Sequence, residues 1–518
     1  MKPRAGFLSL ILVSCIVSVL WVSIARAGES HGSRPAKPGV VDDSQNIDIN
    51  NISMVVKNTG SIAFNTIFSA PGLEFPRGSG KFAVFAAGLW LSALRSGTAC
   101  VSVSEYSDDF SPGDAPGGFP ASPANAAFKV YKLLRVYPDV PSRNAALADY
   151  TFGAVPSGAP PVVVLGNGDL SIVGDQMLWS VYNDLGKSSS FHNNASTARP
   201  VGVEVRQTTW GYNRPGPTGN AVFTSYQFTN RTLDILGDVR ISMWVDPDLG
   251  GFADDLVGCD QPRGLGFCYN ATNADAVYGA SPPAIGFDLL RGPTVGAVTL
   301  PMNAFTRYLN GTDPQDSLES VALMHGLNSD GSPVINPVTS LQTAFAVSGD
   351  PVTNQGWLDS SAGDRRMMLS TGGFSLSPNE SKELTYAIVI GQGSDRLDSI
   401  TKLKLADSAI QSAFDSNTLP LLDAPRPVVA RLALASPRPN PARGALTLEF
   451  TLPSEGEATL GVVDVAGRHV LTHALGVLPA GTHTRAIEMR EAQLAAGVYF
   501  VKLAHANGIV SRRVVVLP

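Results

Sequence analysis

The most concentrated chemistry in this chain is an acidic run between residues 246 and 260. The run directly follows an apolar strand pattern and contains two adjacent glycines, and its five carboxylates are Asp246, Asp248, Asp254, Asp255 and Asp260. Ca²⁺ takes about six to eight oxygen ligands in irregular geometry, so a loop of spaced carboxylates can wrap around it. Without a cation, clustered negative charges raise one another's pKa. The residue types and their spacing therefore predict a Ca²⁺ site in this loop.

Two other interpretations of the acidic run stay open. Its spacing does not match an EF-hand loop, which has a glutamate at its twelfth position, so the run can instead be a solvated acidic loop. A catalytic carboxylate pair of a glycosidase, with an acid and a base about 5–10 Å apart, is the third interpretation. In that case Trp179, Trp210 and Trp244 would line a sugar site, although tryptophans on alternating strands are more often core residues.

The N-terminus has the three parts of a secretory signal peptide. A positive n-region with Lys2 and Arg4 precedes an apolar run over residues 7–24, and Ala25-Arg26-Ala27 is a small-x-small cleavage pattern. We expect cleavage between Ala27 and Gly28, so that the chain meets the membrane only before cleavage. The alternatives are an uncleaved anchor, because an apolar run of this length can span a bilayer, and lipidation at Cys15.

Export predicts the oxidation state of the cysteines. An exported protein folds in an oxidising compartment, where cysteines pair. Cys259 and Cys268 are close enough in sequence to close a short loop, so we expect a disulfide between them that staples the base of the acidic loop. The alternative is that these two and Cys100 are unpaired buried thiols. The sequence does not settle the fate of Cys100.

Composition and charge favour an acidic β protein. Charged residues make up only 16% of the 518 residues, while the chain contains 51 Gly and 37 Pro. This mixture is typical of β-sandwiches with many turns, and it argues against helical bundles and disorder. The formal net charge is −6, and both ends of the chain are basic, so the interior is more acidic still. An acidic body is a poor partner for nucleic acid and a suitable one for divalent cations.

The strand patterns predict a mainly β fold. Residues 203–210, 222–228 and 239–245 alternate between apolar and polar side chains, which indicates a three-stranded meander. One helix is predicted, with Ser394 as its N-cap and apolar residues recurring at helical spacing to Phe414. We expect one or two antiparallel β-sandwich domains with one packed helix, followed by a C-terminal Ig-like sandwich. The expected parts are a signal peptide (1–27), a flexible leader (28–46), a β-rich body (47–418, with two sandwiches if it splits near residue 200), a linker (419–435) and the C-terminal module (436–518).

The C-terminal module contains five ordered motifs within about 80 residues. They are Pro439-Asn-Pro441, Leu452-Pro453, Asp464-Val-Ala-Gly-Arg468, Ala480-Gly-Thr-His483 and Ala496-Gly-Val-Tyr-Phe500. Six or seven short strands over this length predict an Ig-like sandwich. In these motifs the module resembles the type A sorting domain of type IX secretion, and it is equally similar to the Ig-like domain of the hook-cap (FlgD-type) family. The residues that carry the resemblance are Asn440, Pro441, Asp464, Gly467, Arg468, Gly481, Gly497 and Tyr499.

The resemblance implies recognition by an outer-membrane translocon and delivery to the cell surface or the extracellular space. In some members the domain is then removed and the protein is attached to surface lipopolysaccharide. Two departures from the family pattern leave a plain Ig-like surface module as the alternative. The last strand contains Ser511-Arg-Arg513 where a Lys-rich strand is usual, and Ile487-Glu-Met-Arg490 replaces an aromatic-Asp-Gly segment.

The body offers little other chemistry. It is similar, in residues 79–90, 174–183 and 387–393, to large exported bacterial proteins with the same tail, and this resemblance supplies no activity. The body has only His192 and His325 after its leader, which excludes a His-based metal cluster. We predict a non-enzymatic structural or adhesive protein with a Ca²⁺-binding loop, or a scaffold that only holds the tail at the surface. A carbohydrate-active enzyme or glycan-binding protein is the alternative, with surface polysaccharide as a candidate partner.

Overall fold

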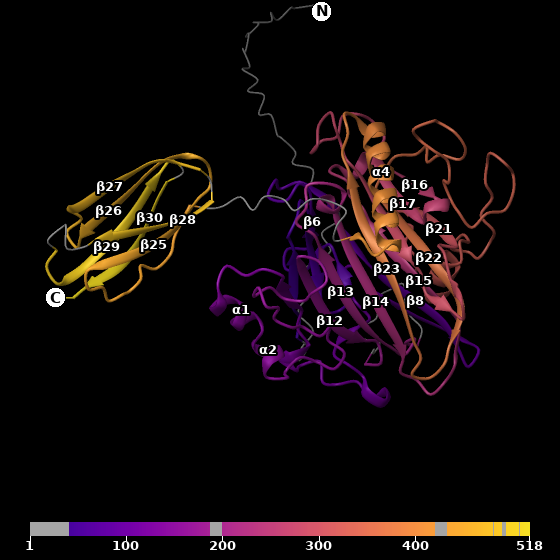
Figure 1. Cartoon of the computed structure of the whole chain (residues 1–518). Helices are drawn as coiled ribbons and strands as arrows, with labels where there is room; N and C mark the ends of the chain where they lie inside the picture. Colours follow the sequence, from indigo (N-terminus) through magenta and orange to yellow (C-terminus); the bar gives the residue numbers. More distant parts are fainter. Residues whose placement is uncertain are drawn as a thin grey trace, which may run out of the picture. The chain divides into compact units, whose positions relative to one another are not determined.

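The computed structural model describes residues 41–186, 199–419, 432–479, 481–488, 494–506 and 508–517. The chain forms two compact units, Met1–Pro425 and Arg426–Pro518, each with its own hydrophobic core (Figure 1). The predicted signal peptide, its cleavage site at Ala27 and Gly28, and most of the predicted leader and linker lie outside the described residues. None of the helices in the described parts combines the length and the hydropathy that crossing a membrane takes.

The larger unit is built on two antiparallel sheets. The strands of the first sheet are β1 (Ser44–Ile47), β2 (Ser53–Lys57), β3 (Ser61–Ile62), β6 (Leu73–Glu74), β7 (Phe82–Val84), β8 (Ala86–Arg95), β9 (Thr98–Val103), β15 (Leu236–Asp246), β21 (Ala304–Leu309) and β22 (Arg365–Leu376). Their order is β21-β22-β15-β8-β3-β2-β6-β7, with β1 beside β2 and β9 beside β8. Strand β21 is therefore an edge strand.

The second sheet faces the first. Its strands are β10 (Ser111–Pro112), β11 (Tyr131–Leu134), β12 (Gln176–Asn183), β13 (Val203–Gly211), β14 (Ala221–Asn230), β16 (Asp255–Asp260), β17 (Leu265–Asn270), β18 (Ala284–Arg291) and β23 (Ser381–Gly391). Their order is β10-β12-β13-β14-β23-β18-β17-β16, with β11 beside β12. Two short hairpins lie outside both sheets, β4 (Phe64–Asn65) with β5 (Ala70–Pro71), and β19 (Thr294–Val295) with β20 (Val298–Thr299).

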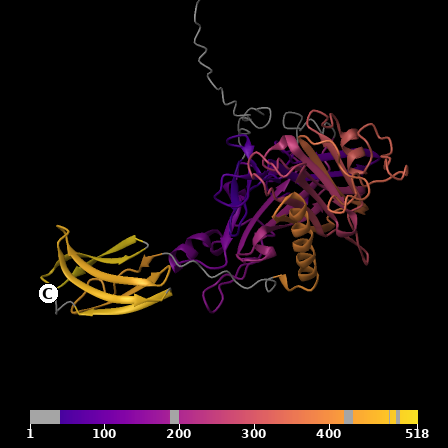
Figure 2. The same ribbon diagram turned by 90° about the horizontal axis from the view of Figure 1, so that it is seen from above.

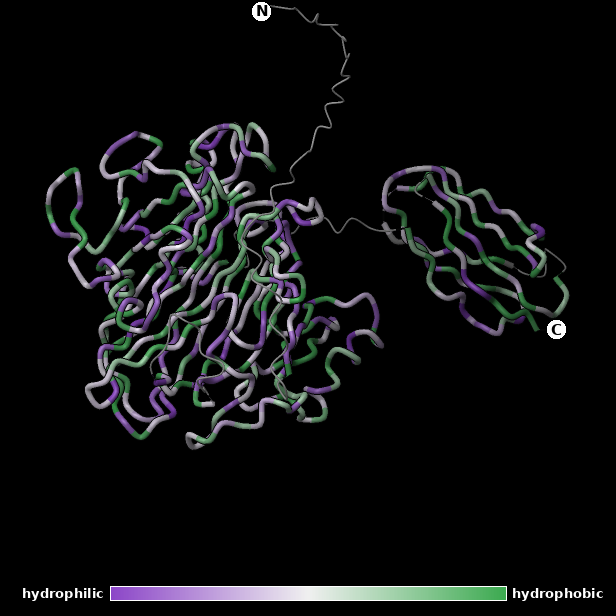
Figure 3. Tube along the Cα trace, turned by 180° about the vertical axis from the view of Figure 1, so that it is seen from behind, coloured by the Kyte–Doolittle hydropathy of each residue, from purple (hydrophilic) through white to green (hydrophobic). Residues whose placement is uncertain are grey.

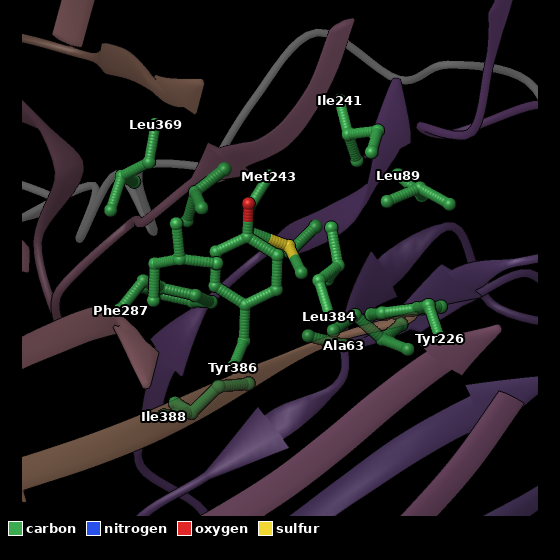
Figure 4. Packing of buried hydrophobic residues seen from close by; sticks show 14 of the residues in the cluster. Ala63, Leu89, Tyr226, Ile241, Met243, Phe287, Leu369, Leu384, Tyr386 and Ile388 are labelled. Carbon is green, nitrogen blue, oxygen red and sulfur yellow. The ribbon is translucent and has the colours of Figure 1, made fainter. Parts of the chain in front are cut away.

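The main core lies between the two sheets. Side chains alternate along each strand, so Ile241 and Met243 of the first sheet meet Tyr226, Tyr386 and Ile388 of the second in one buried cluster. Figure 4 shows Tyr386 at the centre of this packing, with Met243 close to its hydroxyl end. Complete burial of such a side chain contributes roughly 1.5–3 kcal/mol, so this interface is the main source of stability for the unit.

The strand pairing bears on three expectations about the larger unit, of which the split near residue 200 was one of two open options. Strand β8 pairs with β15 and β12 pairs with β13, so segments from both sides of residue 200 share both sheets, and no boundary lies there. The predicted meander is broken because β14 pairs with β23, while β15 belongs to the first sheet. The predicted leader is too long, because β1 starts at Ser44 and its Ile47 is buried in the core.

The predicted helix is present as α4 (Arg396–Asp415). Its N-cap is Asp395 in place of the predicted Ser394, because the Asp395 carboxylate accepts the backbone N–H groups of Leu397 and Asp398, both at 2.9 Å. Helix α4 lies against the second sheet (Figure 2). Its apolar face, which includes Leu403, packs in a buried cluster with side chains of that sheet. Three shorter helices were not predicted: α1 (Val140–Ala146), α2 (Ala148–Thr151) and α3 (Ser317–Met324).

The C-terminal unit is a small two-sheet sandwich. Its strands are β24 (Ala433–Leu434), β25 (Ala445–Leu452), β26 (Gly456–Asp464), β27 (His469–Leu478), β28 (Gly481–Glu488), β29 (Gly497–His505) and β30 (Gly508–Val516). The two sheets have the orders β24-β25-β28 and β27-β26-β29-β30. Leu446, Leu448 and Phe450 alternate into the shared core, and Figure 3 shows polar and apolar residues interleaved along these strands. The mainly β fold predicted for the chain is confirmed.

Candidate functional site

Strand pairing assembles an acidic cluster at one end of the first sheet. In the β15–β22 ladder Val245 lies opposite Met367, so Asp246 at the end of β15 reaches Arg366 at the start of β22. Asp364 immediately precedes β22, and Asp248 follows β15 in the loop. One carboxylate oxygen from each of Asp246, Asp248 and Asp364 lies within 4.8 Å of the other two. The structure thus joins two predicted ligands to a third that the sequence did not indicate.

Two of the three carboxylates have donors within the protein. Asp246 is 2% exposed, its Oδ2 accepts the Tyr106 hydroxyl at 2.5 Å, and its Oδ1 lies 2.6 Å from Nη1 of Arg366. The same guanidinium donates to Asp364 Oδ1. Asp364 Oδ2 accepts the Asn310 amide at 2.9 Å. Arg366 is therefore the resident positive charge of the cluster.

Asp248 is the exception within the cluster. The residue is 9% exposed, and its Oδ1 is buried with no hydrogen-bond partner among the described residues. Its backbone has a φ of 33°, in the left-handed region that non-glycine residues rarely adopt. A buried carboxylate oxygen without a partner costs free energy. The fold holds this carboxylate beside two others despite that cost.

The electrostatics of the cluster follow from burial. Burial raises the pKa of Asp246 to about 6, although Arg366 opposes the shift. Burial, followed by the charge of Asp246, raises the pKa of Asp248 to about 10. Three ionised carboxylates would face one guanidinium, which leaves an uncompensated negative charge inside the protein. The cluster can remove this charge in two ways, by holding a proton or by holding a cation.

The donor set fits a hard divalent cation. All three donors are carboxylate oxygens, which suit Ca²⁺ and Mg²⁺ better than the softer transition metals. Oxygens that bind one Ca²⁺ at about 2.4 Å are at most about 4.8 Å apart, and the three oxygens meet this condition. A divalent cation would also balance three carboxylates and one guanidinium. The close approach of Arg366 to Asp246 and Asp364 means that the cation would share those two carboxylates with the guanidinium.

The other three predicted ligands do not join the cluster. A 3₁₀ turn at Phe252–Asp254 ends the loop, and β16 then carries the chain away into the second sheet. Asp255 Oδ2 accepts the Leu249 backbone N–H at 2.9 Å, and Asp260 pairs with Lys404 at 3.0 Å. Burial raises the pKa of Asp254, which lies beside Asn270. The acidic run is therefore a short loop followed by a strand, and it does not form one wrapping loop.

The predicted disulfide is wrong. In the β16–β17 ladder Cys259 lies opposite Gly266 and Cys268 lies opposite Val257, so the two cysteines are diagonal neighbours. Such pairs are about 7–8 Å apart, beyond the reach of a disulfide. Cys259 and Cys268 are buried thiols that are not joined to each other, and Cys100 is buried as well. The loop is held instead by Asp275, whose Oδ2 accepts the Gly251 backbone N–H at 2.9 Å.

The tryptophans considered for a sugar site are core residues. Trp179, Trp210 and Trp244 are 2%, 7% and 0% exposed. Trp244 donates its indole N–H to the Tyr308 hydroxyl at 2.7 Å and stacks on Trp90. Trp244, Tyr308 and Trp90 belong to one buried hydrophobic cluster, separate from the main core. The three candidate tryptophans cannot line a surface site, so the glycosidase interpretation loses the aromatic part of its support.

The motif residues of the C-terminal unit hold turns and strand ends. Asp464 Oδ1 accepts the backbone N–H groups of Ala466 at 3.0 Å and Arg468 at 2.9 Å, and Gly467 has a φ of 80° within this turn. The Arg468 side chain donates to Asp464 Oδ2 at 3.0 Å. Hydrogen bonding, led by the Arg468 backbone N–H, lowers the pKa of Asp464. The Asp-x-x-Gly-Arg motif is thus a closed, fully bonded turn.

The remaining described motif residues join separate parts of the unit. Asn440 Oδ1 accepts the Val515 backbone N–H at 3.0 Å, and its amide donates to the Arg513 carbonyl at 3.2 Å, so it fastens the start of the module to β30. Pro441 follows directly. Tyr499 donates its hydroxyl to the Ala495 carbonyl at 2.9 Å. Gly481 and Gly497 are the first residues of β28 and β29.

Residues 438–517 match the family described as the secretion system C-terminal sorting domain. This tail shows that the chain is exported to the cell surface or the extracellular space, and that it interacts with the type IX secretion machinery. No curated protein matches the chain.

Solved structures resemble the chain only weakly. A polysaccharide lyase has 12% identity and a TM-score of 0.19 over 60% of this chain and 34% of its own. A heparinase III product has 6% identity and a TM-score of 0.20 over 86% of this chain and 40% of its own. PorZ, titled an essential surface component of the type IX secretion system of Porphyromonas gingivalis, has 11% identity and a TM-score of 0.13 over 69% and 45%. The chain thus spans less than half of each structure, and none of these likenesses carries an argument.

Proposed function

We propose that this protein is a non-enzymatic structural or adhesive component of the cell surface, whose body is stiffened by a divalent cation of calcium's class. The proposed ligands are Asp246, Asp248 and Asp364. The observation that supports the site is the carboxylate of Asp248, whose buried Oδ1 has no partner among the described residues and one of whose oxygens lies within 4.8 Å of two other carboxylates. A cation supplies the positive charge and the coordination that this oxygen lacks.

The position of the cluster gives the cation a structural role. Asp246 ends β15, Asp364 precedes β22, and Asp248 belongs to the loop that leaves the sheet. The same loop is tied to β7 by the hydrogen bond from the Gly250 N–H to the Phe82 carbonyl at 3.0 Å. An ion that binds all three carboxylates would therefore cross-link two strands and a loop. This stiffening suits a protein that has a mechanical rather than a catalytic role outside the cell.

The test is the thermal unfolding of the full chain in EDTA and in Ca²⁺. A ligand at a hundred times its Kd stabilises the folded state by about 2.7 kcal/mol, which corresponds to several degrees for a unit of this size. We expect Ca²⁺ to raise the melting temperature of the larger unit in the wild type. The Asp248→Asn variant keeps the size of the side chain but loses the charge, and we expect it to lose the Ca²⁺ response.

Asp254→Asn is the matched control, because Asp254 belongs to the same acidic run but not to the cluster. This variant should keep the full Ca²⁺ response. A wild-type melting temperature that is the same in EDTA and Ca²⁺ would remove the proposal. Equal responses in both variants would show that Ca²⁺ binds elsewhere.

A further inference from the structure

A pocket lies beside the edge strand β21, where the chain segment after α3 folds back over the strand. Its volume is about 360 Å³, within the range of small-molecule binding sites. Residues of β21, including Arg307 and Leu309, form one side, and Leu327, Val334 and Trp357 of the following segment contribute to the other. Asp246, Asp248 and Asp364 do not line the pocket, so it is distinct from the acidic cluster.

Arg307 is the charged group of the pocket, and its ion pair with Asp359 is a long one. Its side chain is 28% exposed, and its Nε is buried with no hydrogen-bond partner among the described residues. The nearest carboxylate is Asp359, whose Oδ1 lies 3.7 Å from that Nε. Asp359 is already held by Arg365 Nη2 at 2.7 Å and by the Val257 backbone N–H at 3.1 Å. Two guanidinium groups thus share one carboxylate.

This arrangement leaves an excess positive charge at the pocket. An arginine stays protonated in proteins, so it cannot relieve the excess by losing its proton. Burial, and the nearby charge of Arg365, act to lower the pKa of Arg307, while Asp359 opposes them. An anionic group bound in the pocket would supply the missing partner. A carboxylate matches the planar fork of a guanidinium and can accept two hydrogen bonds from it.

The other polar groups of the pocket are mostly engaged. The Thr312 hydroxyl donates to the Leu309 carbonyl at 2.7 Å, and the Thr306 hydroxyl donates to the Leu323 carbonyl at 3.3 Å. The Asn328 amide donates to the Ser332 hydroxyl at 3.0 Å. Arg307 is therefore the main anchor for a polar ligand group. Leu327, Val334 and Trp357 add apolar surface to this otherwise polar lining, and the rest of the ligand must suit both.

Trp357 defines the shape of that apolar surface. Its side chain is half-buried and packs against the main core, and it lines the pocket together with Leu327 and Val334. A flat aromatic face favours a ring that presents C–H groups on one side and polar groups at its rim. A pyranose ring has this character. A pyranose that also bears a carboxylate would satisfy Trp357 and Arg307 together.

We propose that this pocket binds an acidic sugar residue of the uronic acid type, with its carboxylate on Arg307 and its ring against Trp357. The sorting domain delivers the chain to the cell surface or beyond it, so the pocket can meet extracellular ligands. The inference goes beyond the cation proposal and does not depend on it. It gives the body a specific ligand, which the acidic cluster does not.

The test is calorimetric titration of the full chain with digalacturonic acid, and with the neutral disaccharide galactobiose for comparison. All titrations are carried out in EDTA, so that failure of the cation proposal leaves this test unaffected. We expect binding of the acidic disaccharide and binding at least about tenfold weaker for the neutral one, since a charge-assisted pair is lost. Arg307→Met should weaken the acidic ligand by roughly tenfold to a hundredfold, and Arg307→Lys by less.

Matched variants separate the pocket from general charge effects. Arg291→Met removes an arginine that is half exposed and paired with Glu383, and this variant should bind as the wild type does. Trp357→Ala should weaken both disaccharides, and Trp357→Phe should restore part of the binding if the alanine variant does not fold. An unchanged affinity in Arg307→Met would overturn the proposal, as would an absence of binding to the acidic disaccharide. Equal affinity for an N-acetylated dipeptide with a free carboxylate would overturn the sugar class.

Discussion

One aspartate–arginine pair of each unit shows a contrast between a local exposed pair and a distant buried one. In the C-terminal unit Asp464 and Arg468 are neighbours along the chain, and the Arg468 side chain is 80% exposed. In the larger unit Asp246 and Arg366 come from distant segments, and both side chains are 3% exposed. The first pair closes a turn in water, whereas the second belongs to a buried cluster in which three carboxylates face one guanidinium. A local pair thus stabilises the shape of a turn, and a distant buried pair creates a site that can take a ligand.

The largest effect that would sharpen this contrast is the loss of the C-terminal unit. Deletion of residues 432–518 should abolish arrival at the cell surface, because the sorting domain lies within them. The larger unit has its own core and should keep its melting temperature. The measurements are protease accessibility on intact cells and thermal unfolding of the truncated chain. Undiminished surface delivery would show that the body carries its own export signal.

Substitution of each arginine should show that the two pairs contribute different amounts to the free energy of unfolding. Arg366→Ala leaves the Asp246 carboxylate buried without the guanidinium that pairs with it. Loss of one partner of a buried ion pair costs about 3–5 kcal/mol of unfolding free energy. Arg468→Ala removes an exposed partner and should cost at most about 1 kcal/mol. The free energy of unfolding of each unit in denaturant measures both effects. Ca²⁺ should reduce the cost of Arg366→Ala, because a cation would replace the lost positive charge. Equal costs for the two variants would contradict the contrast.

The same contrast explains what the sequence could and could not predict. The C-terminal motifs bond within a few residues, as Asp464 does with Arg468 and Tyr499 with Ala495, so their pattern is visible along the chain. The place of Asp364 depends on the pairing of β15 with β22, which alternation within either strand does not specify. The prediction of a disulfide was wrong for a related reason. Proximity in sequence does not set strand register, and the register placed Gly266 opposite Cys259.

Helix α4 shows the intermediate case. Its apolar spacing is local and predicted the helix, but the choice between Ser394 and Asp395 as N-cap depends on backbone geometry that spacing does not contain. The buried pair between α4 and the second sheet was not visible either. Asp407 of α4 and Asp288 of β18 are 2% and 0% exposed, and they meet only because the helix docks there.

These buried and exposed carboxylates should respond to pH with opposite signs. Burial raises the pKa of Asp407 to about 6, so the folded state holds its proton more tightly than the unfolded state. The stability of the larger unit should therefore fall as the pH rises from about 4 to about 6, by up to about 3 kcal/mol from this group. The pKa of Asp464 is lowered, so its contribution is lost as the pH falls below about 4.

Calorimetry of the full chain between pH 3 and 7 measures both responses, if the units unfold in separate transitions. Asp407→Asn should flatten the pH dependence of the larger unit, and Asp464→Asn should leave that unit unchanged. Asp246, whose pKa burial also raises to about 6, contributes in the same direction as Asp407. A larger unit that becomes more stable between pH 4 and 6 would show that these carboxyl groups do not govern the response.

The smallest expected effect comes from two glycines with the same backbone conformation. Gly250 beside the acidic cluster has a φ of 75°, and Gly467 in the Asp464 turn has a φ of 80°. Alanine in this left-handed region of φ lowers the free energy of unfolding by about 1–2 kcal/mol at either position, because its Cβ lies too close to the backbone. A Cβ on Gly250 would also lie 2.4 Å from the Asp275 carboxylate that holds the loop, whereas a Cβ on Gly467 would meet no atom within 4 Å.

Gly250→Ala should therefore cost about 1–3 kcal/mol more than Gly467→Ala, measured as the free energy of unfolding of the unit that contains each glycine. It should also weaken the Ca²⁺ response, because the loop that carries Asp248 must shift to clear Asp275. Gly467→Ala should leave that response intact. If both variants cost the same and neither alters the Ca²⁺ response, then the loop does not position Asp248, and the distinction between a bonded turn and a ligand-holding loop fails at this point.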